Sequence, residues 1–226
     1  GTSNDTLTIK SDSPNGRFLI SDPSRTISTN ILNATGSGTN TVTIPFASVG
    51  GAQILVNTLA GNDSLTVDLS LGNFSLSIVY DGGTQTTGDS LTLTGGGPFA
   101  SVTHTFTSAA SGSILVSGNE LVSYLGLEPV TDNLSTTNRV FTFNGGAETI
   151  TVTDGTAADG RTNIDSTLGE SVDFINPTGS LTINAGSGDD TVTVTSVDAG
   201  YNVDLTINGD DGSDTVNLNG DITFAS

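Results

Sequence analysis

The sequence has no cysteine, methionine or tryptophan, and His104 is the single histidine among its 226 residues. Without cysteine the chain has no disulfide framework, no thiolate zinc site and no cysteine nucleophile. One histidine cannot supply a metal site built from several imidazoles. These absences exclude thiol chemistry and multi-histidine metal centres.

Positive charge is also scarce. The chain has five Lys and Arg residues against 24 Asp and Glu, which gives a net charge of -19. Proteins that bind nucleic acid neutralise phosphates with clustered Lys and Arg side chains. The charge balance therefore excludes nucleic acid as a partner.

Long apolar runs are missing as well. No stretch approaches the roughly 20 apolar residues of a transmembrane helix, so no membrane span is predicted. The chain opens with Gly1 and shows no basic start followed by an apolar run. We therefore expect no targeting peptide and interpret the chain as a piece of something larger.

The apolar residues that are present, 34% of the chain, alternate with Thr and Ser. This period of two is typical of strands that bury one face, and it argues against disorder. A first pattern joins an acidic or amide residue, a Ser or Thr, and an apolar–polar–apolar triplet. Its copies start at residues 4 (NDTLTI), 39 (TNTVTI), 62 (NDSLTV), 88 (GDSLTL), 147 (AETITV), 189 (DDTVTV) and 213 (SDTVNL).

A second strand type lies between these copies. It occurs at residues 54–57 (ILVN), 76–83 (LSIVYDGG), 181–186 (LTINAG) and 205–212 (LTINGDDG). Together the two patterns predict an all-β chain, a parallel β-solenoid with coils of roughly 24 residues whose stacked faces share a narrow core. The alternative is a set of antiparallel β-sandwich modules, because many short strands with regular turns fit that fold too.

The regularity of the patterns divides the chain into three segments. Residues 1–94 and 145–226 are predicted as N-terminal and C-terminal solenoid segments. Residues 95–144 depart from the pattern and are predicted to form irregular coils or an inserted lobe. Strands are expected at both ends, at residues 6–9 and 222–224, and neither shows a polar cap, so we expect the ends to abut neighbouring modules.

The turns carry the most plausible site chemistry. Residues 185–193 (AGSGDDTVT) and 209–217 (GDDGSDTVN) resemble the calcium-binding nonapeptide of the RTX family, G-G-x-G-x-D-x-apolar-x, and residues 58–66 (TLAGNDSLT) keep less of it. Calcium takes about six to eight oxygen ligands, and closely stacked carboxylates repel one another unless they are neutralised. The candidate metal ligands are Asp189, Asp190, Asp210, Asp211, Asp214 and Asp63, with calcium as the ion. The competing interpretation is that Asp, Asn and Gly favour turns for backbone reasons alone.

A broader resemblance covers most of the chain. Residues 180–224, with the phrases at 81–96, 123–133 and 143–155, look like repeat modules of very large secreted or surface proteins of environmental bacteria, notably planctomycetes. The resemblance implies an extracellular structural or adhesive module with neighbouring copies of the same module, and surface glycans, as candidate partners. It implies no catalytic residue.

The alternative function is a carbohydrate-binding or polysaccharide-degrading β-helix. The five basic residues are scattered, and a charge of -19 repels acidic sugar polymers. Glycoside hydrolysis needs two carboxylates in one groove, for which Asp68 and Asp173 are candidates. His104 is interpreted as an ordinary strand residue, and the chain as a non-enzyme.

The solenoid interpretation also predicts burial at the C-terminal end. Thr193 and Thr206 are expected to be exposed. The predicted buried residues are Val192, Val194, Val203, Leu205, Ile207, Val216 and Leu218.

Overall fold

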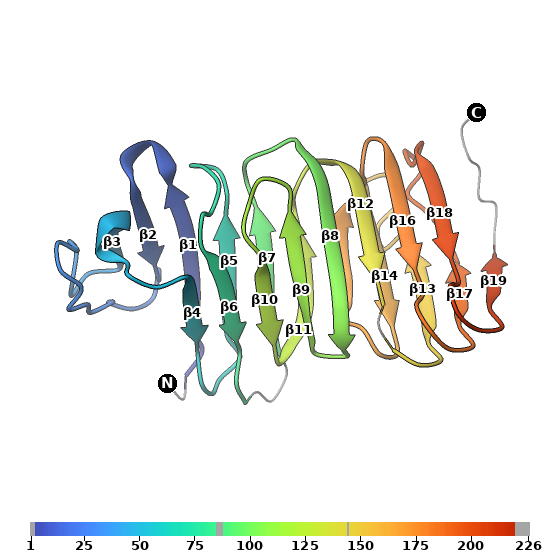
Figure 1. The fold of residues 1–226 in the computed structure, drawn as a ribbon, viewed down its shortest axis with the longest axis horizontal. Coiled ribbons are helices and arrows are strands. Elements are labelled where there is room, and N and C mark those ends of the chain that lie inside the picture. Colours follow the sequence, from blue (N-terminus) through green and yellow to red (C-terminus); the bar gives the residue numbers. More distant parts are fainter. Residues whose placement is uncertain (1–2, 85–87, 144, 220–226) are drawn as a thin grey trace.

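The computed structural model describes residues 3–84, 88–143 and 145–219. It is all-β, as predicted, with 52% strand and 3% helix, and its strands form two mixed sheets with no closed barrel. Figure 1 shows the strands arrayed side by side along the long axis of the molecule. Within the described residues the helical segments, Ser13–Asn15 and Phe46–Ser48, are short 3₁₀ turns, and no helix is long and apolar enough to cross a membrane.

The large sheet has eleven strands. Their spatial order is β19 (Thr215–Leu218), β17 (Thr191–Val194), β13 (Thr149–Thr153), β14 (Arg161–Ser166), β15 (Val172–Ile175), β11 (Leu127–Asp132), β7 (Asp89–Thr94), β5 (Ser64–Asp68), β1 (Thr6–Asp12), β2 (Arg17–Ser21) and β3 (Thr41–Pro45). The small sheet has eight strands. Their order is β18 (Asp204–Asn208), β16 (Ser180–Asn184), β12 (Thr136–Thr142), β8 (Phe99–Ser108), β9 (Ser111–Val116), β10 (Val122–Leu125), β6 (Ser77–Asp81) and β4 (Gln53–Asn57).

The two sequence patterns separate by sheet. All seven copies of the acidic–Ser/Thr pattern contribute strands to the large sheet, namely β1, β3, β5, β7, β13, β17 and β19. All four copies of the second pattern lie in the small sheet, in β4, β6, β16 and β18. The two sequence patterns therefore distinguish the strands of the large sheet from those of the small sheet.

Successive strands of one sheet pair in parallel with like residues opposite. Ile54 pairs with Ile78, Leu181 with Leu205 and Thr191 with Thr215, an offset of 24 residues in each case. Ser64 pairs with Ser90, an offset of 26. Between two such strands the chain visits the other sheet once, as in the order β4, β5, β6, β7.

The longer intervals in the sequence come from added antiparallel strands. Three meanders, β1–β2–β3, β8–β9–β10 and β13–β14–β15, contain every antiparallel strand pair of the described residues. The first and third lie in the large sheet and the second in the small sheet. In each of the two internal meanders the chain reverses direction twice within one sheet. The last strand of the meander then pairs in parallel with an earlier strand of that sheet, β10 with β6 and β15 with β11.

The predicted middle segment, residues 95–144, supplies β8 to β12 and therefore strands of both sheets. Register shifts occur here, between Phe106 and Ser108 and between Leu127 and Val130. Both sheets run on through this segment to the strands on either side. The three-part division of the chain stays a prediction.

The core lies between the two sheets and is filled by alternate residues of each strand. Leu65 and Val67 of β5, like Leu91 and Leu93 of β7, are at most 1% exposed. Phe106 stacks on Phe143 at 4.6 Å between ring centroids. Because equivalent strands pair in register, each inward side chain packs on its counterpart in the next turn.

Burial at the C-terminal end follows the prediction only in part. Val192 and Val194 are buried and Thr206 is exposed, as predicted. The remaining inward residues of β18, Leu205 and Ile207, are partly buried, as are Val203 and Thr193. The prediction was wrong for Val216 and Leu218, which are 49% and 55% exposed. They occupy the same register as Val192 and Val194, but no further strand pairs with β19 in the described part of the chain.

The other end of the large sheet is partly covered. Residues 22–40 loop over β3, and Thr35 exchanges two backbone hydrogen bonds with Thr43, both of 2.9 Å. The expected terminal strand at residues 6–9 is part of β1, inside the sheet and not at its edge. The expected strand at residues 222–224 lies outside the described residues.

Substitution of an inward residue in an inner and an outer strand should separate their contributions to stability. Val194→Asp places an unpaired charge in the core and should lower the free energy of unfolding by about 3 kcal/mol or more. Leu218→Asp, at the equivalent position of β19, should cost less than about 1 kcal/mol. Urea unfolding of both variants checks this, and equal losses would contradict the exposure of β19.

Candidate cation sites

The two turns with the best calcium-like sequences lie next to each other. The Gly188 N–H donates to the Asp211 carbonyl at 2.7 Å, and the Asp211 N–H donates to the Gly186 carbonyl at 3.2 Å. Ser187 and Asp211 form an isolated parallel bridge. The turns before β17 and β19 are thus joined in the same register as the strands.

Four acidic residues at the start of large-sheet strands accept a hydrogen bond from the backbone of the preceding turn. The Asp190 carboxylate accepts the Glu148 N–H at 2.7 Å, and the Asp214 carboxylate accepts the Asp190 N–H at 3.0 Å. Further along the sheet Asp63 accepts the Asp5 N–H and Asp89 accepts the Asp63 N–H, both at 2.6 Å. These four side chains therefore satisfy one backbone donor per turn at the start of the strands.

Glycine makes room for these carboxylates. A Cβ on Gly209 would overlap the carboxylate of Asp214, and a Cβ on Gly82 would overlap that of Asp89. The glycine and the aspartate of the turn pattern are thus spatially complementary, which gives both residues a structural reason.

Only one oxygen of each inner carboxylate is used. The second oxygens of Asp63, Asp89 and Asp190 are buried and accept no hydrogen bond among the described residues. Burial raises the pKa of Asp89, with Asp63 and Asp81 acting in the same direction. The pKa of the nearby Tyr80 is raised by burial and by the negative charges of Asp89 and Asp63.

The remaining predicted ligands face solvent. Asp189, Asp210 and Asp211 are exposed, and the Asp189 carboxylate accepts the Ser213 N–H at 2.9 Å. Asp63 precedes β5, which five strands of the large sheet separate from β17, so it lies far from the other five residues. The structure brings five of the six predicted ligands into adjoining turns, and calcium binding by them stays a prediction.

A tighter acidic cluster lies at the opposite ends of the same strands. Asp154 and Asp159 belong to the loop between β13 and β14, and Asp198 to the loop between β17 and β18. One carboxylate oxygen of each lies within 4.8 Å of the other two, so these side chains could hold a metal ion. This is the group that meets that criterion in the described part of the chain.

Hydrogen bonds fix this cluster between two turns of the chain. The Asp198 carboxylate accepts the Gly160 N–H at 3.2 Å and the Gly200 N–H at 2.8 Å. The Asp154 N–H donates to the Ser196 hydroxyl at 2.9 Å. Oδ1 of Asp154 is buried without a hydrogen-bond partner, which leaves a free ligand atom in the cluster.

Sequence reasoning missed this cluster because it searched for glycine–aspartate turns before strands. The signal that was available is the 42-residue offset between β13 and β17, which brings the acidic loops TDG at 153–155 and SVD at 196–198 together.

A buried ionic group crosses the middle of the core. Asp132 pairs with Arg139 and lies 2.9 Å from Nε2 of His104, and all three side chains are 0% exposed. Burial works to raise the pKa of Asp132, but Arg139 and His104 outweigh it and hold the pKa below its usual range. Burial lowers the pKa of His104, so the ring stays neutral. The neutral His104 is thus hydrogen-bonded to the structural Asp132–Arg139 ion pair, beyond the reach of solvent.

The carboxylates considered for glycoside hydrolysis are also paired. Asp68 binds Lys10 at 2.6 Å across β5 and β1, and Asp173 binds Arg161. Neither is joined to a second free carboxylate in these contacts, so the structure adds no support for a hydrolytic pair formed by them.

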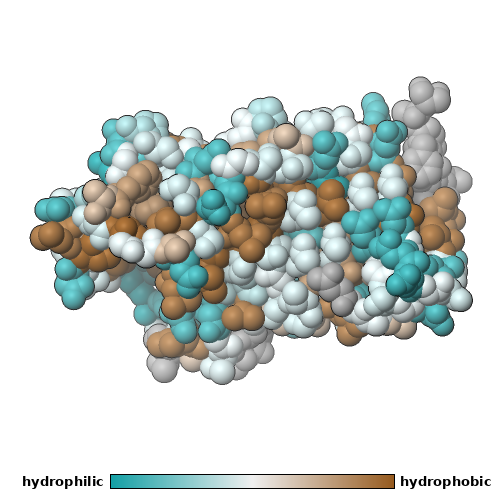
Figure 2. All heavy atoms as spheres, in the orientation of Figure 1, coloured by the Kyte–Doolittle hydropathy of each residue, from teal (hydrophilic) through white to brown (hydrophobic). Residues whose placement is uncertain are grey.

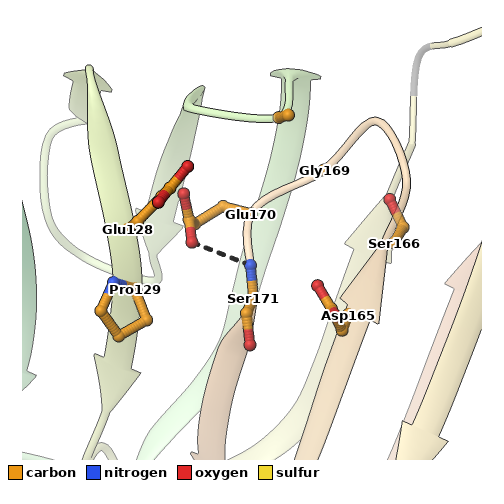
Figure 3. A pocket seen from close by; sticks show the side chains of 8 residues that line it. Glu128, Pro129, Asp165, Ser166, Gly169, Glu170 and Ser171 are labelled. Carbon is orange, nitrogen blue, oxygen red and sulfur yellow. Dashed lines mark hydrogen bonds between the residues drawn. The ribbon is translucent and has the colours of Figure 1, made fainter. Parts of the chain in front are cut away.

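A separate acidic pocket of about 430 Å³ lies where β11 meets the loop between β14 and β15. Glu128, Asp165 and Glu170 line it, and Figure 3 shows the Glu170 carboxyl turned towards Glu128. Glu170 is 3% exposed, its Oε1 accepts the Ser171 N–H at 3.0 Å, and its Oε2 is buried without a hydrogen-bond partner. Burial, with Glu128 and Asp165, raises the pKa of Glu170 to about 8.

Comparison with known proteins identifies no relative. No family model matches the chain, and neither a curated protein nor a solved structure shows significant similarity to it.

Calcium should stabilise the protein through the Asp154 cluster. Weak extracellular sites have Kd values of about 10⁻⁴ to 10⁻³ M, so about 10 mM calcium should add roughly 1.4 to 2.7 kcal/mol and raise the Tm. Asp154→Asn combined with Asp198→Asn should remove this response, because both carboxylates lose their charge. The measurement is thermal unfolding in chelator and in calcium.

The matched control is Asp190→Asn combined with Asp214→Asn, whose amide oxygens can still accept the backbone N–H groups. We expect this variant to keep its calcium response. Loss of the response in the control alone would locate the ion in the stacked turns, and equal melting curves with and without calcium would count against both sites.

Glu170 should make stability fall as pH rises. Its pKa in the fold, about 8, lies above the ordinary value of 4.5, so protonated Glu170 stabilises the fold fully below pH 4.5. That contribution is lost as pH rises through 8. Glu170→Gln, which mimics the protonated form, should match the wild type at pH 4.5 and be more stable above pH 8. Urea unfolding across this range checks the difference, with the exposed Glu120→Gln as a control that should show none.

Proposed function

We propose that the chain is a two-sheet parallel β-solenoid and that it serves as a structural or adhesive repeat module of a large extracellular bacterial surface or fibre-forming protein. Offsets of 24 to 26 residues between paired strands support the solenoid. So does the alternation of the chain between sheets. A sandwich of independent hairpins would not place like residues opposite one another at that offset.

The observation that carries the function is the end formed by β18 and β19, which no further strand covers among the described residues. Val216 and Leu218 point along the core register and are half exposed. Apolar atoms are visible at this right-hand end of the molecule in Figure 2. An edge strand with an apolar inward face is a template for pairing with another chain.

The strand directions favour continuation of the stack. Every strand that is not the middle of a meander runs parallel to the others of its sheet, from β3 to β19 and from β4 to β18. A neighbouring copy of the same module can therefore extend both sheets at this end without reversing polarity. The loop of residues 22–40 covers part of the opposite end, so the two ends are not equivalent.

Calcium fits this role at the Asp154 cluster. The cluster joins the loops of two successive turns, so an ion bound there would hold the turns together. Extracellular calcium reaches the millimolar levels that weak sites need. The alternative, a carbohydrate-binding or polysaccharide-degrading β-helix, has less support. The exposed large apolar residues of the described ranges are Ile, Leu and Val, which offer no aromatic face for stacking on a sugar ring.

The proposal predicts association through the uncovered end. The protein should form larger species as its concentration rises in sedimentation velocity, and Val216→Lys combined with Leu218→Lys should abolish this by charging the exposed strand face. Leu115→Lys combined with Leu125→Lys is the matched control, because these residues are 47% and 49% exposed but lie on β9 and β10, away from the end.

The control variant should associate like the wild type. A protein that stays monomeric at every concentration, with fast hydrogen exchange in β19 at each of them, would contradict the proposal. So would equal loss of association in both variants.

A further inference from the structure

The acidic pocket around Glu170 has no cation of its own. Each of the five basic side chains forms an ion pair elsewhere, Lys10 with Asp68, Arg17 with Asp12, Arg25 with Asp5, Arg139 with Asp132 and Arg161 with Asp173. The pocket therefore places Glu128, Asp165 and Glu170 around one cavity without a neutralising partner from the described chain.

The pocket also contains an unsatisfied polar atom. Glu170 is only 3% exposed, and its Oε2 accepts no hydrogen bond among the described residues. Its other oxygen is held by the Ser171 N–H, which fixes the carboxyl in the orientation seen in Figure 3. In the ionised form of Glu170 this oxygen is a buried acceptor without a donor, which is unfavourable, so a ligand that brings an N–H donor would be stabilised there.

The shape of the pocket argues against a bare metal ion. Its three carboxylates are not among the groups whose oxygens lie within 4.8 Å of one another, unlike Asp154, Asp159 and Asp198. Its volume of about 430 Å³ is that of a site for a small organic molecule. Ala109 and Pro129 add apolar wall between the carboxylates.

We propose that this pocket binds the primary ammonium group of a small organic amine, with the ammonium N–H groups donating to Glu170 and its charge facing Glu128 and Asp165. The short aliphatic stem of the amine packs against Ala109 and Pro129. An ammonium group has three donors in a compact head, which suits carboxylates that approach from different strands.

Proton release accompanies binding. The groups facing Glu170 are Glu128 from β11, Asp165 from β14 and Tyr124 from β10, whose own pKa is raised by burial and by Glu170. Because the pKa of Glu170 is about 8, the carboxyl is mostly protonated at neutral pH and must ionise to accept the ammonium N–H fully. Binding of a primary amine should therefore become tighter as pH rises from 7 to 9. The probe, n-butylamine, keeps its positive charge over this range.

Titration with n-butylamine, followed by ¹⁵N–¹H NMR, tests the proposal. The amides of Gly169 and Ser171 should shift with saturation, and tetramethylammonium, which has no N–H donor, should bind at least fivefold more weakly. Glu170→Gln should raise the Kd for n-butylamine at least fivefold at pH 9. Glu120→Gln, the same change at an exposed site outside the pocket, should leave the Kd unchanged.

The design separates the proposal from its competitors. Calcium that shifts Gly169 and Ser171 more strongly than n-butylamine would make the pocket a metal site and overturn the proposal. Equal affinity for the two amines would show charge attraction alone, and absence of saturable shifts would show no site. Glu170→Gln mimics the protonated carboxyl, so this variant should keep the fold. A second variant, Glu128→Gln with Asp165→Asn, changes no buried group and should also weaken binding.

Discussion

In-register parallel pairing is the constraint on which the rest of this structure depends. Thr191 pairs with Thr149 on one side and Thr215 on the other, so a residue type chosen in one turn is set against its own kind in the next. Apolar residues gain from this arrangement, since Ile150 pairs with Val192 and Val152 with Val194, and all four side chains are buried. The same arrangement disfavours a carboxylate that recurs in register, because it then lies opposite a like charge on the next strand.

The same pairing explains why Gly and Asp recur before the strands of the large sheet. Asp190 and Asp214 each extend the hydrogen-bond ladder by one side-chain bond, and Gly209 leaves the space that the Asp214 carboxylate fills. A turn built in this way resembles a calcium-binding nonapeptide because both need glycine for close approach and aspartate for its oxygens. A backbone role is therefore enough to account for the pattern, and a metal ion would be an addition to it.

Strand faces, the all-β class and the 24-residue offset were predictable because each depends on local alternation and on short repeats. The meanders were not, since a strand that folds back in the plane of its sheet, such as β9 or β14, has the same alternation as one that continues the stack. Alternation could not predict the exposure of Val216 and Leu218, because that depends on whether a further strand pairs with β19, and none does among the described residues. The Asp154 cluster and the Glu170 pocket join loops far apart in sequence, and only the 42-residue offset of β13 and β17 could have pointed to the first.

Carboxylates in this chain are accommodated in several ways, and the groups around each one decide which applies. A carboxylate in the ladder, such as Asp190, accepts a backbone N–H. One on a strand beside a basic residue, such as Asp68 with Lys10, forms an ion pair. With only five basic residues in the chain, a buried carboxylate that has neither contact is stabilised by a proton, as burial favours for Glu170, or by a cation from solution. The compact Asp154 cluster suits a metal ion and the wider Glu170 pocket suits an organic cation, because the spacing of the oxygens sets the size of the charge they can share.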